Sequence, residues 1–164
     1  MKNLLVAVCA LFFIYGAAAQ SNVSVEKQLP NILLRDDDGK VINTESLRNL
    51  ANWVFIVADA SLPSTRNLLS GLSEKNEVYD QQTTVLLIGS ESQIKELSGA
   101  REKLAGIRWV YSTEPFVIKS LGLPGAPSIL GLRADGRIAW QFSGLPNPAE
   151  KLTTMIQGWL QNPS

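Results

Sequence analysis

Two short, uninterrupted apolar segments bounded by turn residues constrain the fold of this chain more than any other feature. Residues 53–58 and 84–88 are rich in aliphatic and β-branched side chains and have the length of strands rather than helices. Strands that are apolar at every position are buried on both faces, as in parallel sheets covered by helices. Apolar side chains then recur at helical spacing over residues 64–79 and 94–104, and the second of these segments ends at Gly106. This alternation predicts an α/β fold.

Weaker signals on either side of this centre extend the pattern. The polar turn at residues 36–40 separates two short extended segments and predicts a β-hairpin, followed by a helical turn at 44–48 that Asn43 or Thr44 caps. The remaining segments are expected to be a strand at 108–111, a helix at 114–121 closed by Gly122, a hairpin of strands 128–132 and 138–142, and a last helix beginning at Pro148. Parallel strands joined by helices, then an antiparallel hairpin and a packed final helix, predict a three-layer α/β sandwich. Periodicity alone leaves several α/β topologies open.

The first nineteen residues have the pattern of a secretory signal peptide. Lys2 supplies a positive start, residues 4–15 are almost entirely apolar, and Ala17-Ala18-Ala19 offers a cleavage site. The apolar run is shorter than the ~20 residues that a membrane-spanning helix needs. We therefore expect residues 1–19 to be removed on export, leaving residues 20–164 as one domain in the periplasm or outside the cell, without a membrane span. Acylation of Cys9, as in a lipoprotein, is disfavoured because Val8 before it is not a small residue.

The residues after this leader contain neither cysteine nor histidine, because Cys9 is the only cysteine of the chain. This composition excludes a structural disulfide, a thiolate nucleophile, an imidazole base and nearly every transition-metal site. We expect no cofactor and no metal. Removal of Lys2 leaves fourteen basic residues against fifteen acidic ones, without a basic run, so nucleic-acid binding is also disfavoured.

Three motifs, taken in order, resemble those of the thioredoxin-like superfamily. The opening sequence from Leu33 to Leu47, which contains Asp-Gly-Lys-Val-Ile, is similar to the pattern L-x-D-x-x-G-K-x-V-x-L. Residues 54–66 resemble a strand that runs into W-C-x-x-C, with Ala60 in place of the tryptophan and Ser61 and Ser64 in place of the cysteines. The third motif resembles the family's G-x-P-T strand entry and its later D-x-x-G-x-I, and it consists of Gly125-Ala126-Pro127-Ser128 followed by Asp135-Gly136-Arg137-Ile138.

The resemblance extends from Leu29 to Leu160 and is strongest for periplasmic redoxins of the TlpA and AhpC/TSA types. It implies a thioredoxin-like α/β/α sandwich with an N-terminal β-hairpin and a central βα insertion, and it implies a cis peptide bond before Pro127. The activity implied by the family is thiol-disulfide exchange. In this chain Ser61 and Ser64 occupy the two positions at which that chemistry occurs.

A serine cannot take over the role of cysteine at the start of a helix. A thiolate there is stabilised by unpaired amides and by the helix dipole, which lowers the thiol pKa from about 8.5 towards neutrality. A serine hydroxyl holds its proton far more tightly, and the chain has no histidine to remove it. We therefore interpret Ser61 as a loop residue and Ser64, or Thr65, as the cap of the following helix, and we assign no catalytic residue.

Other conspicuous residues have structural interpretations that outweigh functional ones. We interpret Asp59 as a turn former rather than a cation ligand, and the Asp36-Asp37-Asp38 run as a hairpin turn rather than a calcium site. Arg66 is at best a contact at the rim of the loop. The four tryptophans are expected in the core rather than at a ligand surface: Trp53, Trp109, Trp140 and Trp159.

The leading functional hypothesis is a secreted, non-redox thioredoxin-like domain that binds a protein or an extended peptide in a groove beside Pro127. In this hypothesis the backbone of Ala126 pairs with the bound chain as an added strand. The facing loop, Ser61-Leu62-Pro63-Ser64, supplies an apolar floor through Leu62 and Pro63.

Two alternatives remain open at this point. One is an oxidoreductase homologue whose activity is residual or depends on a partner, and the other is a structural subunit of an envelope secretion or conjugation assembly. An exposed apolar patch on the loop face would favour binding, whereas a patch on the helices opposite would favour assembly.

Overall fold

The computed structural model describes residues 27–73, 82–145 and 150–161. These residues form an eight-stranded sheet in the order β1-β8-β7-β4-β5-β6-β2-β3. Its strands are β1 (Lys27–Gln28), β2 (Leu33–Arg35), β3 (Val41–Asn43), β4 (Trp53–Asp59), β5 (Thr83–Ile88), β6 (Arg108–Ser112), β7 (Ser128–Leu132) and β8 (Arg137–Ser143). The helices are a 3₁₀ turn η1 (Thr44–Leu47), α1 (Pro63–Ser73), α2 (Glu91–Glu96), α3 (Ser98–Lys103), α4 (Val117–Ser120) and α5 (Glu150–Gln161).

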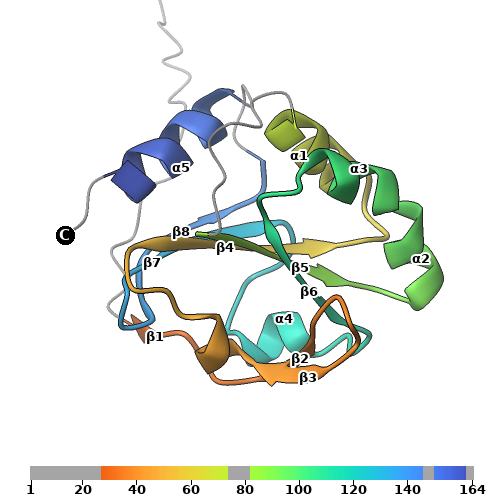
Figure 1. Cartoon of the computed structure of the whole chain (residues 1–164), viewed down its shortest axis with the longest axis horizontal. Coiled ribbons are helices and arrows are strands. Elements are labelled where there is room, and N and C mark those ends of the chain that lie inside the picture. Colours follow the sequence, from red (N-terminus) through yellow and green to blue (C-terminus); the bar gives the residue numbers. More distant parts are fainter. Residues whose placement is uncertain (1–26, 74–81, 146–149, 162–164) are drawn as a thin grey trace, which may run out of the picture.

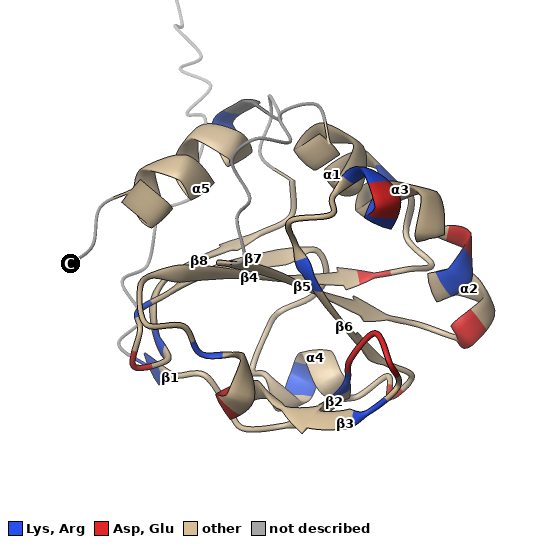
Figure 2. Cartoon of the chain, viewed as in Figure 1, with Lys and Arg blue, Asp and Glu red and all other residues tan. Residues whose placement is uncertain are grey.

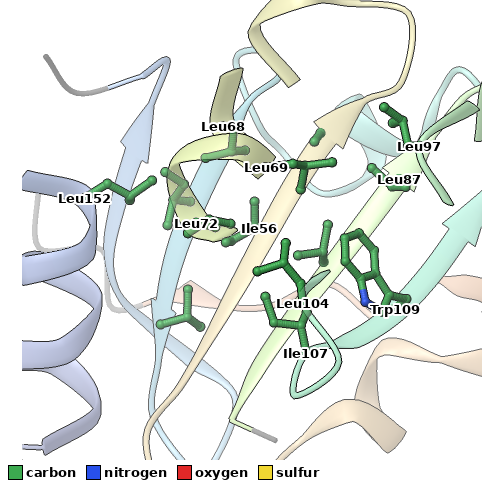
Figure 3. Packing of buried hydrophobic residues seen from close by; sticks show 14 of the residues in the cluster. Ile56, Leu68, Leu69, Leu72, Leu87, Leu97, Leu104, Ile107, Trp109 and Leu152 are labelled. Atoms are coloured by element: carbon green, nitrogen blue, oxygen red, sulfur yellow. The ribbon is translucent and has the colours of Figure 1, made fainter. Parts of the chain in front are cut away.

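The sheet separates two layers of different make-up (Figure 1). Helices α1, α2, α3 and α5 cover one face, while α4, η1 and the curled β2–β3 hairpin cover the other. Alternate residues of β4 point into the two layers, because successive side chains of a strand face opposite ways. Ile56 packs under α1, α3 and α5 with Leu68 and Leu104 (Figure 3). Phe55 packs with Leu47 and Leu121 on the far side of the sheet. The predicted three-layer α/β/α sandwich is confirmed.

The strand directions bring several loops to one end of the sheet. Strands β4, β5 and β6 are parallel, and β7 runs antiparallel to β4, with Val57 opposite Ser128. Strand β8 returns antiparallel to β7, with Ser143 opposite Ser128. We call this the loop end of the sheet, and it comprises residues 60–63, 89–90, 113–116, 124–127 and 144–145.

The central helical segment differs from the prediction. A single helix over residues 94–104 is wrong, because the chain breaks at the buried Leu97 into α2 and α3. Helix α2 begins earlier than predicted, since Ser90 and Gln93 form a reciprocal capping box ahead of it. Helix α3 ends at Lys103, where Leu104 turns into the core, so Gly106 does not close a helix.

Most other boundaries agree with the sequence. The Asn43 side chain caps η1 by accepting a hydrogen bond from the backbone of Ser46 at 2.9 Å. Helix α4 begins at Val117 rather than Glu114 and is closed as predicted by Gly122 at φ +70°. The two-residue strand β1 was not predicted. The leader, residues 74–79 of the first predicted helix and Pro148 lie outside the described residues.

Candidate functional site

The Ser61 loop is built on Asp59, the last residue of β4. The Asp59 carboxylate oxygen Oδ1 accepts hydrogen bonds from the Ser61 backbone at 2.8 Å and from the Ser61 hydroxyl at 2.6 Å. Its carbonyl oxygen accepts from the Leu62 backbone at 3.1 Å and from the Thr65 hydroxyl at 2.5 Å. Asp59 is therefore a turn former, as predicted, and it fixes the loop through both its side chain and its backbone.

Helix α1 starts at Pro63, a residue suited to the first helical position because its missing N–H would be unpaired there in any case. The predicted cap is wrong. The Thr65 hydroxyl donates back to Asp59 instead of accepting from the helix. Within the described residues the half-buried Ser64 hydroxyl makes no hydrogen bond. The start of α1 is thus held by Asp59 and Pro63.

The hydroxyl of Ser61 has no partner that would make it a nucleophile. Its hydrogen bond goes to the Asp59 carboxylate, which already serves the loop backbone. Activated serines depend on a positioned base such as histidine, and this chain has none. The contact therefore orders the turn.

The peptide bond between Ala126 and Pro127 is cis, as the family resemblance implies. Pro127 is buried, its carbonyl accepts from Gly144 at 2.8 Å, and the Ser128 hydroxyl donates to the Gly125 carbonyl at 2.6 Å. Between these anchors, the backbone N–H and C=O of Ala126 make no hydrogen bond within the described residues. Ala126 is half-buried, so an unpaired stretch of backbone lies at the surface next to the cis proline.

The topology places the two predicted halves of the site at the loop end of the sheet. Ser128 pairs with Val57, so the chain enters β7 through Pro127 beside the end of β4 from which the Ser61 loop emerges. The groove predicted between the loop and Pro127 stays a prediction, because register alone does not define a groove.

Among the described residues, three of the six exposed large apolar side chains lie at this end, while Leu33 and Val41 lie on the β2–β3 hairpin. Leu62 (36%), Phe116 (69%) and Leu145 (36%) follow β4, β6 and β8 respectively. Leu50, which is fully exposed, precedes β4 at the opposite end. Among the described residues, none of the exposed large apolar side chains lies within α1, α2, α3 or α5.

Sequence reasoning missed a polar cluster centred on Asp37. One carboxylate oxygen of Asp37 accepts from the Arg101 guanidinium and from the Tyr111 hydroxyl, each at 2.6 Å. The guanidinium also lies over the rings of Tyr111 and Trp109, at 5.3 and 5.8 Å from their centroids. Burial raises the pKa of the Tyr111 phenol above its ordinary value, and the hydrogen bond to Asp37 raises it further. No local pattern signals this cluster, because Arg101 and Tyr111 lie 64 and 74 residues beyond Asp37.

The remaining candidates have structural partners. The Asp36 carboxylate accepts from the backbone of Asp38 and Lys40, so it forms the predicted hairpin turn while Asp37 points to α3. No group of three or more acidic, histidine or cysteine side chains within the described ranges is placed to hold a metal. Arg66 is paired with Glu96 at 3.0 Å, so it ties α1 to α2 and is not a rim contact.

The tryptophans pack as predicted. Trp53 and Trp109 are buried. Trp140 and Trp159 are partly buried and meet edge to face at 6.1 Å, against the helix-covered side of the sheet.

The fold is shared with solved structures of low sequence identity. A secreted thiol-disulfide isomerase from Corynebacterium glutamicum superposes with a TM-score of 0.65, covering 90% of this chain and 96% of its own, at 13% identity. The C-terminal domain of a putative thiol-disulfide oxidoreductase from Bacteroides thetaiotaomicron gives 0.62 at 18% identity, covering 84% and 96%. A putative thiol:disulfide interchange protein DsbE from Chlorobium tepidum gives 0.59 at 13% identity, covering 85% and 99%.

The chain has a thioredoxin-like fold.

No family model matches this sequence. No curated protein matches it either. Over the part of the chain that the structure describes, no helix is both long and apolar enough to cross a membrane. Ser61 lies in the turn between β4 and α1, and Ser64 lies in the first turn of α1; the family resemblance implies cysteines at these two positions.

Proposed function

We propose that this chain is a secreted or periplasmic thioredoxin-like protein that binds an extended segment of another protein and performs no thiol chemistry. The observation that carries the proposal is the unpaired backbone of Ala126 beside the cis Pro127. An N–H and a C=O of one surface residue can pair with an extended chain as an added strand, and this contact needs no sulfur.

The apolar side chains at the loop end support the same function. A bound strand presents alternate side chains to the surface on which it lies. Leu62, exposed Pro63, Phe116 and Leu145 offer apolar contacts at this end of the sheet, so the proposed ligand carries apolar side chains on either side of the residue paired with Ala126.

The same distribution disfavours a structural subunit that assembles through its helices. Such a subunit would present an apolar patch on the helical layer. Within the described residues, α1, α2, α3 and α5 carry no exposed large apolar side chain.

The proposed compartment rests on two observations. The first nineteen residues have the pattern of a secretory leader. The structurally similar isomerase from Corynebacterium glutamicum is a secreted protein.

Affinity capture from an envelope and culture-medium extract of the source organism tests the proposal. The bait is the purified protein, compared with Leu62→Ser, Phe116→Ser and, as the matched control, Leu50→Ser at the opposite end of the sheet. A ligand bound at the loop end should be captured about fivefold less by the first two variants and equally by the control. A partner that is lost only with Leu50→Ser would overturn the proposal, as would equal capture by all four baits.

A further inference from the structure

A hollow of about 640 Å³ lies between the β2–β3 turn, the end of β6 and the helices α2 and α3, and no residue of the Ser61 loop lines it. Volumes of this order are typical of small-molecule sites. Both signs of charge appear on α2, on α3 and on the turn (Figure 2). Three cations and three carboxylates line the hollow: Arg35, Lys95 and Arg101, with Asp36, Asp37 and Glu91.

One wall of this hollow is rigidly held. Asp37 receives the guanidinium of Arg101 and the hydroxyl of Tyr111 on a single oxygen, which ties the turn to α3 and β6. The stacking of Arg101 over Tyr111 and Trp109 fixes the guanidinium further. A wall with so many restraints is preorganised, so a ligand would not have to order it on binding.

The opposite wall keeps two charges available. Lys95 and Glu91 stand one turn apart on α2, and neither makes a hydrogen bond or an ion pair within the described residues. The other four charged groups already have partners, since Arg101 pairs with Asp37, Asp36 accepts from the turn backbone, and Arg35 donates to the Gly39 carbonyl. The unengaged charges are thus one ammonium and one carboxylate.

The opposite charges of Lys95 and Glu91 indicate the class of ligand that the hollow can bind. A ligand of one sign would be attracted by one of the two unengaged charges and repelled by the other. A zwitterion can place its carboxylate at Lys95 and its ammonium at Glu91. Among the described residues that line the hollow, Ile94 is the only one with an aliphatic side chain, which disfavours a lipid or another apolar ligand. We propose that this hollow binds a short zwitterionic peptide through Lys95 and Glu91.

Isotope-edited NMR titration with triglycine tests the site, and three capped probes separate the two charges. These are triglycine amide, which keeps only the ammonium, acetyl-triglycine, which keeps only the carboxylate, and acetyl-triglycine amide, which keeps neither. We expect saturable shifts at Lys95, Ser98 and Thr113 with triglycine below about 50 mM, an upper limit set well above a millimolar dissociation constant. Each single cap should weaken binding about threefold, as expected for an exposed ion pair.

Variants assign the two contacts. Lys95→Gln should weaken the binding of triglycine and acetyl-triglycine about threefold and leave the binding of triglycine amide unchanged. Glu91→Gln should weaken the binding of triglycine and triglycine amide about threefold and leave the binding of acetyl-triglycine unchanged. Lys119→Gln on α4, in the other layer, is the matched control and should change nothing. Binding of the doubly capped probe as tight as that of triglycine, the absence of saturable shifts, or equal effects of the three variants would each refute the proposal. Leu62→Ser should leave triglycine binding intact, which separates this site from the Ser61 loop.

Discussion

Replacing Gly131 with alanine tests the packing of the sheet beneath the aromatic pair. Gly131 lies in β7, directly opposite Trp140 of β8. A Cβ atom added at Gly131 would lie 2.1 Å from the Cε2 and Nε1 atoms of the Trp140 ring. Carbon atoms normally pack at about 3.5–4.0 Å, so the ring would have to move by about 1.5 Å. Trp140 also meets Trp159 edge to face, and this contact would be lost with the movement.

The cost can be worked from these contacts. Overpacking a buried site costs about 1–3 kcal/mol, and loss of an aromatic pair costs a further 0.5–1.5 kcal/mol or so. Alanine lowers the conformational entropy of the unfolded chain relative to glycine, and this offsets about 0.5–1 kcal/mol of the lost stability. We expect Gly131→Ala to lower the free energy of unfolding by about 0.5–4 kcal/mol and the melting temperature by roughly 2–14 °C.

Urea unfolding followed by tryptophan fluorescence measures this change. Gly158→Ala on α5 is the matched control, because a Cβ there meets no atom within 4 Å, and it should stabilise the protein by about 0.5–1 kcal/mol. In a Trp140→Val background the ring is absent, so Gly131→Ala should lose most of its cost. A Gly131→Ala protein as stable as the wild type, or an undiminished cost in the Trp140→Val background, would show that Trp140 does not lie over Gly131.

Four further predictions concern the loop and the Asp37 cluster. The double variant Ser61→Cys with Ser64→Cys should form an intramolecular disulfide on mild oxidation, which intact mass detects. Adding Asp59→Asn should lower the pKa of the thiol at position 61, because the Asp59 carboxylate, which lies 2.6 Å from the Ser61 hydroxyl, would repel a thiolate there. Failure of the two thiols to join would contradict their placement at the start of α1. The unmodified protein should show no reductase or peroxidase activity in insulin and peroxide assays, since no cysteine follows Cys9, and turnover that survives purification would refute this. Asp37→Ala should lower the free energy of unfolding by about 1–3 kcal/mol, because it leaves Arg101 and Tyr111 without their acceptor. The control is Asp38→Ala at the adjacent exposed residue, which should change that free energy by less than about 0.5 kcal/mol. Equal effects of the two substitutions would argue against the cluster. The raised pKa of Tyr111 contributes stability that is fully present below the phenol's unfolded-state pKa of about 10 and is lost as the pH rises above that value. The free energy of unfolding, measured between pH 9 and 11 or so, should therefore fall more steeply for the wild type than for Tyr111→Phe. Parallel curves for the two proteins would refute the assignment.

Local chemistry was sufficient for much of the candidate site. Asp59 acts through residues close to it in sequence, so its role as a turn former could be predicted. The cis peptide bond before Pro127 was implied by the family resemblance, and the start of α1 at Pro63, one residue before the predicted start, was not predicted. The helix cap could not be predicted in this way, because the Thr65 hydroxyl can bond either to the amides of its own helix or to the Asp59 carbonyl. The path of the loop places it against the carbonyl. The availability of the Ala126 backbone likewise depends on which other groups the fold brings near it.

The sequence by itself determined the layers of this protein, because strand and helix periodicity is a property of neighbouring residues. The runs at 53–58 and 84–88 could be buried only inside a covered sheet. Tertiary structure alone decided the break at Leu97, where the side chain is drawn into the core at the cost of a continuous helix. It also decided the meeting of Asp37, Arg101 and Tyr111, since chain segments distant in sequence become neighbours only when the hairpin curls against the helices.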